Sequence, residues 1–433
     1  MSTPAGSAGG GSKADWLAHT IALVVVAVGF LVIKPWRADR SPIPPVALST
    51  GATLELPLRG YLYTYSAHPC LASGLARTLA DGSSIVLFGS SELTSADHPS
   101  KPMNFFNNEL HVPLAAIGHA GNQSFSIYAQ LVAADADLSR SRIAILVSPG
   151  WFIGKPGRRG TDLEAFLEYQ PAPSLYRMRE RFLSGDPDVA RVASYLADHR
   201  LDLGAAGPIV RWNVRAASSW GVVANPFAQW WDNFVIDATA ERMICEPPTI
   251  ERPMPPRVEL GPGEWEDRLA QGSAEHLAQC TNNPFFVNDA FYAEYVAGET
   301  RTVEALPFNE GRELTDLVLL LDYLKAHNAH PFFVLQPLNP FVYTNTKDLD
   351  PTMDRIREEL DARDFALLDL WSSDTADFEP GILTDVMHLG PVGWYRIDST
   401  LAAYFPRRGS AAEGRRRDAR CAPSSNPTGA RDQ

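Results

Sequence analysis

The sequence lacks the motifs that mark several large protein classes. It contains only four cysteines, Cys70, Cys245, Cys280 and Cys421, and no pair of them has the spacing of a zinc site. It has no glycine-rich phosphate loop, no His-Glu-x-x-His motif and no internal repeat, so we predict no cofactor. The net charge of −13 makes nucleic acid an unsuitable partner. These absences exclude P-loop nucleotide binding and zinc-protease chemistry.

The cysteines leave two alternatives open. Four of them allow three complete pairings. Cys245 and Cys280 flank a proline-rich stretch and could form a disulfide bond in an oxidising compartment. Buried structural thiols are the other interpretation, and the spacing alone does not decide between them.

Long hydrophobic runs are absent except at residues 16–33, which are almost wholly apolar. As a helix this segment would span about 27 Å, close to the thickness of a bilayer core. The charged and proline-containing Lys34-Pro35-Trp36-Arg37 follows it and offers no small-residue cleavage site. We therefore predict an uncleaved transmembrane anchor, preceded by a polar N-terminus (residues 1–15) and followed by a proline-rich linker (residues 34–60).

Charge is unevenly distributed at the two ends of the chain. Lys13 precedes the predicted anchor whereas Lys34, Arg37 and Arg40 follow it, a balance that by itself favours a cytoplasmic body. Residues 407–433 contain seven arginines and three acidic residues among small and polar ones. We predict a basic disordered tail there; contact with an anionic lipid or polymer is the alternative.

Apolar runs alternate with amphipathic stretches along the middle of the chain. The predicted strands are residues 84–88, 112–117, 142–148, 331–336 and 366–370. The predicted helices are residues 124–137, 311–328, 352–363 and 394–405. Strands that alternate with helices predict an α/β fold with a parallel sheet covered by helices on both faces.

The alternation is interrupted between about residues 163 and 280, where we predict a mostly helical insertion. Its clearest helical pattern covers residues 189–201. Further on, it contains four tryptophans, which are typical of core or inter-helix packing. A surface that faces a membrane or a partner is the alternative. The four are Trp212, Trp220, Trp230 and Trp231.

The first predicted strand ends in Phe88-Gly89-Ser90-Ser91-Glu92-Leu93. A glycine at the end of a buried strand allows a sharp turn, and a serine directly after it is exposed at the edge of the sheet. Ser91 is thus a candidate nucleophile whose backbone N–H would help to bind an oxyanion. A helix cap made by the Ser-Ser-Glu sequence is the alternative interpretation.

A second candidate segment is Asp385-Val386-Met387-His388, near the C-terminus. A serine hydroxyl is a weak nucleophile until an imidazole removes its proton and a carboxylate orients that imidazole. His388 would be this general base and Asp385 its orienting carboxylate. An isolated Asp-x-x-His is more often a helix cap or a surface ion pair, but its position before a C-terminal helix favours the catalytic role.

Two further segments follow predicted strands and could complete a catalytic site. Gly121 is a candidate backbone donor to an oxyanion and Gln123 a candidate side-chain donor, although a plain helix-entry turn would look similar. Trp151 and Phe152, which follow Ser148-Pro149-Gly150, could exclude water from the site.

These segments together resemble the D-alanyl transfer protein family, DltD, whose members have an SGNH-hydrolase-like fold. The resemblance covers residues 81 to 398, and it departs from the family in its scarcity of lysine, its proline- and arginine-rich composition and its basic tail. The matching features are the N-terminal anchor, Phe88–Leu93, His98-Pro99, Ser148–Phe152, Thr281–Phe285, Asp385–Gly390 and Gly393-Trp394.

The resemblance implies an SGNH- or flavodoxin-like catalytic domain at residues 61–406, held outside the cytoplasmic membrane. It implies a Ser91 acyl-enzyme with His388 as acid and base, and transfer of an acyl group, D-alanyl in the family, to an envelope polymer such as teichoic acid. The implied partners are a DltB-like membrane-bound O-acyltransferase, the polymer acceptor and, as a further candidate, an acyl carrier protein. An esterase of the same fold and a non-catalytic scaffold for the acyltransferase remain alternatives.

Overall fold

The computed structural model describes residues 62–63, 71–153 except 83 and 96, single positions between 161 and 181, and residues 184–198, 255–297, 300–301 and 311–405. All of them belong to the compact unit that begins at Glu55. The predicted N-terminus, anchor, linker and C-terminal tail lie outside the described residues. Within the described part, no helix is both long enough and apolar enough to cross a membrane.

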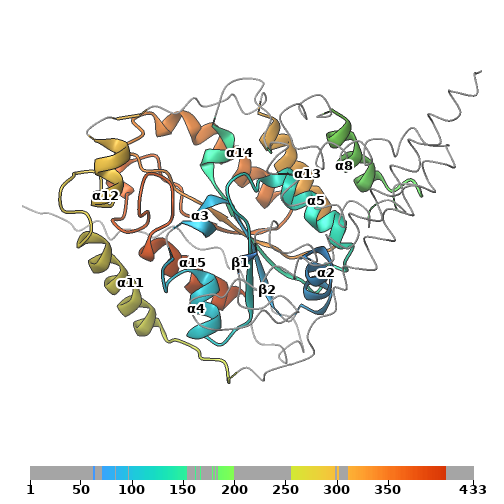
Figure 1. The fold of residues 1–433 in the computed structure, drawn as a ribbon, viewed down its shortest axis with the longest axis horizontal. Coiled ribbons are helices and arrows are strands. Elements are labelled where there is room, and N and C mark those ends of the chain that lie inside the picture. Colours follow the sequence, from blue (N-terminus) through green and yellow to red (C-terminus); the bar gives the residue numbers. More distant parts are fainter. Residues whose placement is uncertain are drawn as a thin grey trace, which may run out of the picture. The chain divides into compact units, whose positions relative to one another are not determined.

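Six parallel strands form one sheet, in the order β1-β3-β2-β4-β5-β6. Figure 1 shows β1 and β2 in the middle of the domain, with helices around them. The strands are β1 (Leu62–Tyr63), β2 (Ile85–Phe88), β3 (Leu114–Ile117), β4 (Arg142–Val147), β5 (Phe332–Leu335) and β6 (Ala366–Asp369). The predicted parallel sheet is confirmed: each of the five predicted strands is present, shortened by one or two residues. The two-residue β1 is an additional edge strand, which pairs with β3.

The central strand β2 explains why these apolar runs become strands. All four of its residues are buried. Val86 pairs in register with Ala115 of β3 on one side and with Ile143 of β4 on the other. A parallel strand with both faces covered has no polar face, so its sequence reads as a continuous apolar run rather than an alternating one.

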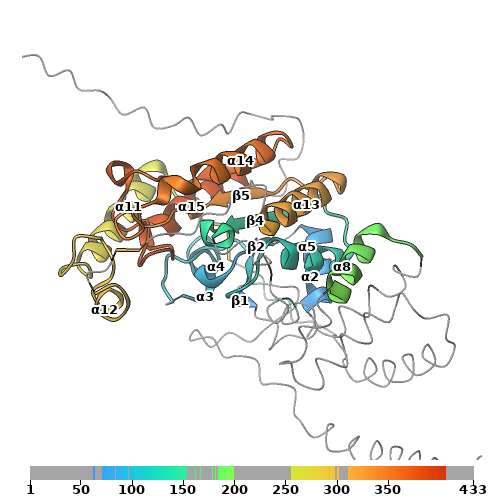
Figure 2. The same cartoon turned by 90° about the horizontal axis from the view of Figure 1, so that it is seen from above.

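Helices cover both faces of the sheet (Figure 2). On one face α2, α5 and α13 lie together, with α8 against α5 and α14 against α13. On the other face α4 contacts α15, and α11 packs along α15. The longer helices are α2 (Leu71–Asp81), α5 (Ser124–Ala134), α8 (Pro187–Asp198), α11 (Pro262–Leu277), α13 (Arg312–Ala326), α14 (Asp350–Asp361) and α15 (Pro391–Tyr404). The shorter ones are α3 (Ser91–Thr94), α4 (Pro102–Asn108), the 3₁₀ turns η2 (Pro149–Phe152), η6 (Thr346–Leu349) and η7 (Thr375–Asp377), α12 (Asp289–Phe291) and the π-helical η5 (Tyr292–Val296).

The four predicted helices between strands are all present, with ends shifted by up to three residues. The helix predicted at 189–201 is observed as α8, and α11 also lies within the predicted insertion. Most of the remaining insertion, including the four tryptophans, lies outside the described residues. The sequence pattern did not predict helices α2 and α4.

The face of the sheet that meets α4 and α15 contains the main hydrophobic cluster. Ile85 and Leu87 of β2 point into it, together with Phe105 of α4 and Trp394 of α15, and each of these side chains is at most 1% exposed. Phe105 also makes an edge-to-face contact with Tyr395, at a ring-centroid distance of 5.5 Å. This packing fixes the C-terminal helix α15, and therefore the loop before it, against the sheet.

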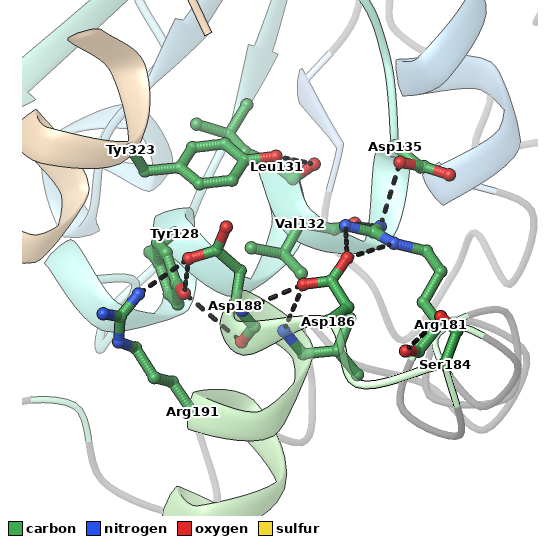
Figure 3. A network of polar contacts seen from close by, with 11 residues as sticks. Tyr128, Leu131, Val132, Asp135, Arg181, Ser184, Asp186, Asp188, Arg191 and Tyr323 are labelled. Atoms are coloured by element: carbon green, nitrogen blue, oxygen red, sulfur yellow. Dashed lines mark hydrogen bonds and ion pairs between the residues drawn. The ribbon is translucent and has the colours of Figure 1, made fainter. Parts of the chain in front are cut away.

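On the opposite face a polar network ties α8 to α5 (Figure 3). The Tyr128 hydroxyl donates a hydrogen bond of 2.8 Å to Asp188 at the start of α8. Arg181 forms ion pairs with Asp186 (2.8 Å) and with Asp135 (3.1 Å). Asp135 has a left-handed backbone (φ 52°) that ends α5 three residues before the sequence pattern predicts.

Replacement of Leu87 by alanine tests the core assignment. Leu87→Ala should lower the free energy of unfolding by about 2–5 kcal/mol, because it leaves a cavity under α4 and α15. The matched control is Leu277→Ala, at a side chain that is 46% exposed, which should change this free energy by no more than about 0.5 kcal/mol. Urea titration followed by circular dichroism measures both; equal losses would contradict the burial described here.

Candidate active site

The connectivity of the sheet marks one edge as the place for a site. After β2 the chain crosses to β3 on one side, and it then returns past β2 to form β4 on the other side. In open α/β sheets such a reversal leaves a crevice beyond the carboxyl end of the first strand, because its two neighbouring crossovers diverge to opposite faces. Here that end is Phe88, and Gly89 and Ser90 follow it directly.

The turn after β2 is tightly packed against the end of β3. A Cβ atom at Gly118 would lie 2.0 Å from the carbonyl oxygen of Gly89, so this position requires glycine. A Cβ atom at Gly89 would lie 2.6 Å from Oε1 of Glu92 and would displace that side chain. The side chain of Asn122, which is fully buried, donates a hydrogen bond of 2.9 Å to the same Gly89 oxygen. This turn ends the strand and starts α3 at Ser91.

A second turn, before α15, carries the aspartate and the histidine. Its two arms form an antiparallel bridge between Leu383 and Leu389, and Thr384 N donates to the carbonyl oxygen of His388 at 2.8 Å. Oδ1 of Asp385 accepts hydrogen bonds from the backbone N–H groups of Met387 (2.9 Å) and His388 (2.8 Å). These bonds turn both side chains toward the same side of the loop.

The two turns meet, although 297 positions separate the residues that touch. Nε2 of His388 lies 3.0 Å from Oγ of Ser91. Nδ1 of His388 lies 2.7 Å from Oδ2 of Asp385. The three predicted side chains thus form one continuous row of hydroxyl, imidazole and carboxylate, which is the arrangement required to activate a serine.

The electrostatic surroundings raise the proton affinity of the His388 imidazole. Burial lowers the pKa of His388. Its hydrogen bond to Asp385 and the charges of Asp385 and Glu92 together raise the pKa by more, so the pKa lies above its ordinary value. The side chain of Asp385 is only 10% exposed and that of His388 is 23% exposed. An imidazole held in this way accepts a proton readily and is still reachable from solvent.

The predicted oxyanion and water-excluding residues lie at the same edge, after β3 and β4. Gly121 has a positive φ of 88°, and Gln123 stands at the start of α5 with its buried Oε1 unpartnered. Trp151 and Phe152 lie in η2 and are 7% and 4% exposed. Within the described residues, no hydrogen bond joins any of these four residues to Ser91 or His388.

The histidine turn is also held by Asn339 and Asn288, which lie outside both turns. The Asn339 N–H donates to the carbonyl oxygen of Val386 at 3.0 Å, and its side-chain amide donates to that of Phe285 at 2.8 Å. The Asn288 N–H donates to the carbonyl oxygen of Thr384 at 3.1 Å. Two asparagines that are distant from both turns in the sequence therefore hold the histidine turn in place.

Two further residues lie at this edge: Glu92, which the sequence indicates only as part of a helix cap, and Gln336, which it does not indicate. Glu92 is 2% exposed and its Oε1 accepts the Ser90 N–H at 2.6 Å. Gln336 directly follows β5 and is 1% exposed. The position of Glu92 beside the serine was a usable signal, because Ser-x-Glu spacing favours a cap; Gln336 offered none.

The described residues contain no group of three or more His, Cys, Asp or Glu side chains that could bind a metal ion. Cys280 has a free thiol, and its Sγ lies 3.2 Å from Nε2 of His276. Its proposed disulfide partner, Cys245, lies outside the described residues. Burial raises the pKa of the Cys280 thiol to about 11, so this group is protonated near neutral pH.

The fold and the site define the chain as an α/β protein with a parallel sheet and a serine–histidine–aspartate row at the switch point. The DltD protein family matches residues 74–205 and 237–406, and the chain belongs to this family. Protein DltD of Bacillus subtilis (strain 168) is 25% identical over 368 residues, which cover 78% of this chain and 87% of that protein. Protein DltD of Lacticaseibacillus rhamnosus is 20% identical over 405 residues, 88% of this chain and 89% of that protein.

Replacement of Asp385 by asparagine tests the electrostatics of the row. Asp385→Asn should lower the pKa of His388, because the carboxylate that stabilises the imidazolium is lost. The pKa is measured by NMR titration of the histidine ring in protein with ¹⁵N-labelled histidine. Asp374→Asn, which alters an exposed cap of η7, is the control and should leave the His388 titration unchanged. A His388 pKa unaffected by Asp385→Asn would contradict the proposed ion pair.

Proposed function

We propose that this chain is a membrane-anchored acyltransferase that moves an acyl group, D-alanyl by analogy with its family, to a cell-envelope polymer through an acyl-enzyme at Ser91. The observation that carries the proposal is the 3.0 Å contact between Ser91 Oγ and His388 Nε2. A serine hydroxyl in hydrogen-bond contact with an oriented imidazole is the chemistry of acyl transfer. Membership of the DltD family supports the same class of reaction.

In the first step Ser91 Oγ attacks the carbonyl carbon of an acyl ester or thioester. The hydroxyl proton passes to Nε2 of His388, which is the atom within reach of it. The new Oγ–carbon bond forms as the bond to the donor's leaving oxygen or sulfur breaks, and His388 returns the proton to that leaving group. Asp385 holds the ring orientation and stabilises the imidazolium.

In the second step a hydroxyl of the acceptor polymer attacks the acyl-enzyme. His388 takes the acceptor's proton, the acceptor oxygen bonds to the acyl carbon, and the Ser91 Oγ–carbon bond breaks. The proton then returns to Oγ, and the serine is ready for another cycle. The backbone of Ser91 with that of Gly121, and the amide of Gln123, are our candidates for donors to the negatively charged oxygen that forms in both steps.

We further propose that the anchor at residues 16–33 places the domain on the outer side of the cytoplasmic membrane. The proposed partners are a DltB-like membrane-bound O-acyltransferase, an envelope polymer and an acyl carrier protein. We do not propose nucleic acid as a partner. Because lysine is scarce and the tail is basic, the acceptor could be lipopolysaccharide instead of teichoic acid, and the acyl group need not be D-alanine. None of these steps requires a cofactor.

An envelope esterase is the second candidate function, and one observation favours it. The side chain of His388 is 23% exposed, so water could approach the same base that would activate the acceptor hydroxyl. Both reactions use the same acyl-enzyme, and they differ only in what resolves it. A scaffold that presents substrate to the acyltransferase would need neither Ser91 nor His388 to be reactive.

Cells that lack the gene test these functions directly. Ser91→Ala and His388→Ala should fail to restore ester-linked acyl groups to the envelope, with a loss of at least about 10³-fold in transfer rate. The measurement is the D-alanine and other acyl groups released from the envelope by mild base. More ester in both variants than in wild type indicates an esterase, and wild-type levels in both indicate a scaffold.

The water-excluding role of Trp151 has its own test. Trp151→Ala should lower the ratio of transfer to hydrolysis by about 10-fold, because a smaller side chain at the end of β4 admits water to the acyl-enzyme. The ratio is measured by product analysis with a polyol acceptor in water. Trp265→Ala, which removes a tryptophan from α11 on the outer layer, is the matched control and should keep the wild-type ratio. A Trp151→Ala enzyme with the wild-type ratio would remove this residue from the proposal.

A further inference from the structure

A second carboxyl group is buried directly beneath the nucleophile. Glu92 follows Ser91 in α3 and is 2% exposed. Its Oε1 accepts the N–H of Ser90 at 2.6 Å, so the carboxyl group folds back under the turn that carries Ser91. A Cβ atom at Gly89 would lie 2.6 Å from the same oxygen, which shows how closely the strand end fits around it. The turn and the carboxyl group are thus packed as one unit.

Holding the Ser90 N–H does not by itself explain a buried carboxyl group. At the start of α11, Glu264 makes the same contact with the N–H of Gly261 at 2.7 Å, but from an exposed position. An uncharged acceptor would satisfy the Ser90 N–H without the desolvation that a buried carboxylate requires. Burial raises the pKa of Glu92, whereas the hydrogen bond from the Ser90 N–H, the charge of His388 and the Gln336 amide lower it and so favour its charged form.

Three groups face the Glu92 carboxyl from different elements. His388 interacts with it electrostatically from the second turn, and the Gln336 amide lies beside it at the end of β5. Lys101 interacts with it from the start of α4, but its ammonium group is held by the carbonyl oxygens of Leu93 (2.9 Å) and Ser95 (2.7 Å). Of the two cationic partners, only His388 changes its charge during acyl transfer as proposed above.

We propose that Glu92 is a positioning residue for the Ser91 reaction: it fixes the nucleophile turn through the Ser90 N–H, and its charge supports the imidazolium that forms on His388. The inference rests on the proposed function, because it concerns the same proton transfer. Glu92 does not touch the reacting atoms. It acts through the turn on one side and through the imidazole on the other.

The sign of the effect on His388 follows from all the groups that face it. Asp385 and Glu92 raise the pKa of His388, whereas burial and the charge of Lys101 lower it. Removal of the Glu92 charge should therefore lower this pKa. Since the general base must be unprotonated, the acidic limb of the rate profile then moves to lower pH, and the base becomes weaker.

The test uses a fluorophosphonate probe on the full chain in detergent micelles. Ser91 Oγ bonds to phosphorus, fluoride leaves, and the hydroxyl proton goes to His388, so the labelling rate reports serine activation without a known substrate. Glu92→Gln keeps an acceptor for the Ser90 N–H and removes the charge. We expect labelling about 10-fold slower than wild type, an acidic limb at lower pH and an unchanged melting temperature. Glu92→Ala should also lower the melting temperature.

Glu264→Gln is the matched control, because it changes the equivalent contact of α11, and it should label as wild type does. If Glu92→Gln does not fold, Gln336→Met replaces it. The Gln336 amide lowers the pKa of Glu92 and so favours its charged form, and loss of the amide should move the acidic limb in the same direction by a smaller amount. A wild-type rate and pH profile in Glu92→Gln, or in Gln336→Met where that variant is used, overturns the inference and shows a purely structural cap.

Ser91→Ala separates this outcome from failure of the proposed function. Absence of labelling in Ser91→Ala, together with wild-type behaviour of Glu92→Gln, overturns the role of Glu92 alone. Labelling of Ser91→Ala at the wild-type rate overturns the proposed nucleophile, and the role of Glu92 with it. Absence of labelling in Ser91→Ala with a slower, acid-shifted Glu92→Gln supports both.

Discussion

The contact between Ser91 Oγ and His388 Nε2 depends on two turns that are far apart in the sequence and meet in space. Most of the observed structure serves to hold those turns. One turn ends β2 and is held from β3 by Asn122. The other precedes α15 and is closed by its own antiparallel bridge. A hydrogen bond between two side chains requires placement within a few tenths of an ångström, so neither turn can be set by its local sequence alone.

The sheet provides this placement because β2 lies at its centre, with β3 on one side and β4 on the other. The main hydrophobic cluster also holds α15 against the sheet. Trp394 of that helix packs into the cluster that includes Leu87 of β2. The strand before the serine and the helix after the histidine therefore share one core. Packing energy, rather than the weak contact itself, brings the two groups together.

Much of the fold could be predicted from sequence because its signals are local. Buried parallel strands are short apolar runs, and the crossover helices have apolar faces, so every predicted strand was confirmed and the helix ends differed by at most three residues. The elements that were missed include β1, α2 and α4, and α4 shows the limit. Helix α4 has only seven residues, too few for a clear sequence pattern. The role of its Phe105 is visible only when α15 lies against it.

The candidate site divides in the same way. Gly89 and the Asp-x-x-His spacing are local features, and they identified the three residues that the structure brings into contact. The supports are not local: Asn339 contacts Phe285 across 54 positions, and Gln336 reaches the surroundings of Glu92 from β5. No spacing rule connects such residues, because their proximity is created by the order of strands in the sheet.

The alternatives that the sequence left open at Ser-Ser-Glu are partly compatible, because the Ser90 side chain makes no cap hydrogen bond and only the Glu92 half of the cap is present. Glu92 does accept the N–H of Ser90, as a cap would, and Ser91 does face an imidazole, as a nucleophile would. A four-residue helix such as α3 gains little from a cap, because it has few backbone bonds to propagate. The buried Glu92 carboxyl is better explained by its contact with the Ser90 N–H and its charge near His388 than by capping of α3. The same residue can fix the direction of the serine and set the charge around its base, so that turn geometry and proton affinity are controlled together.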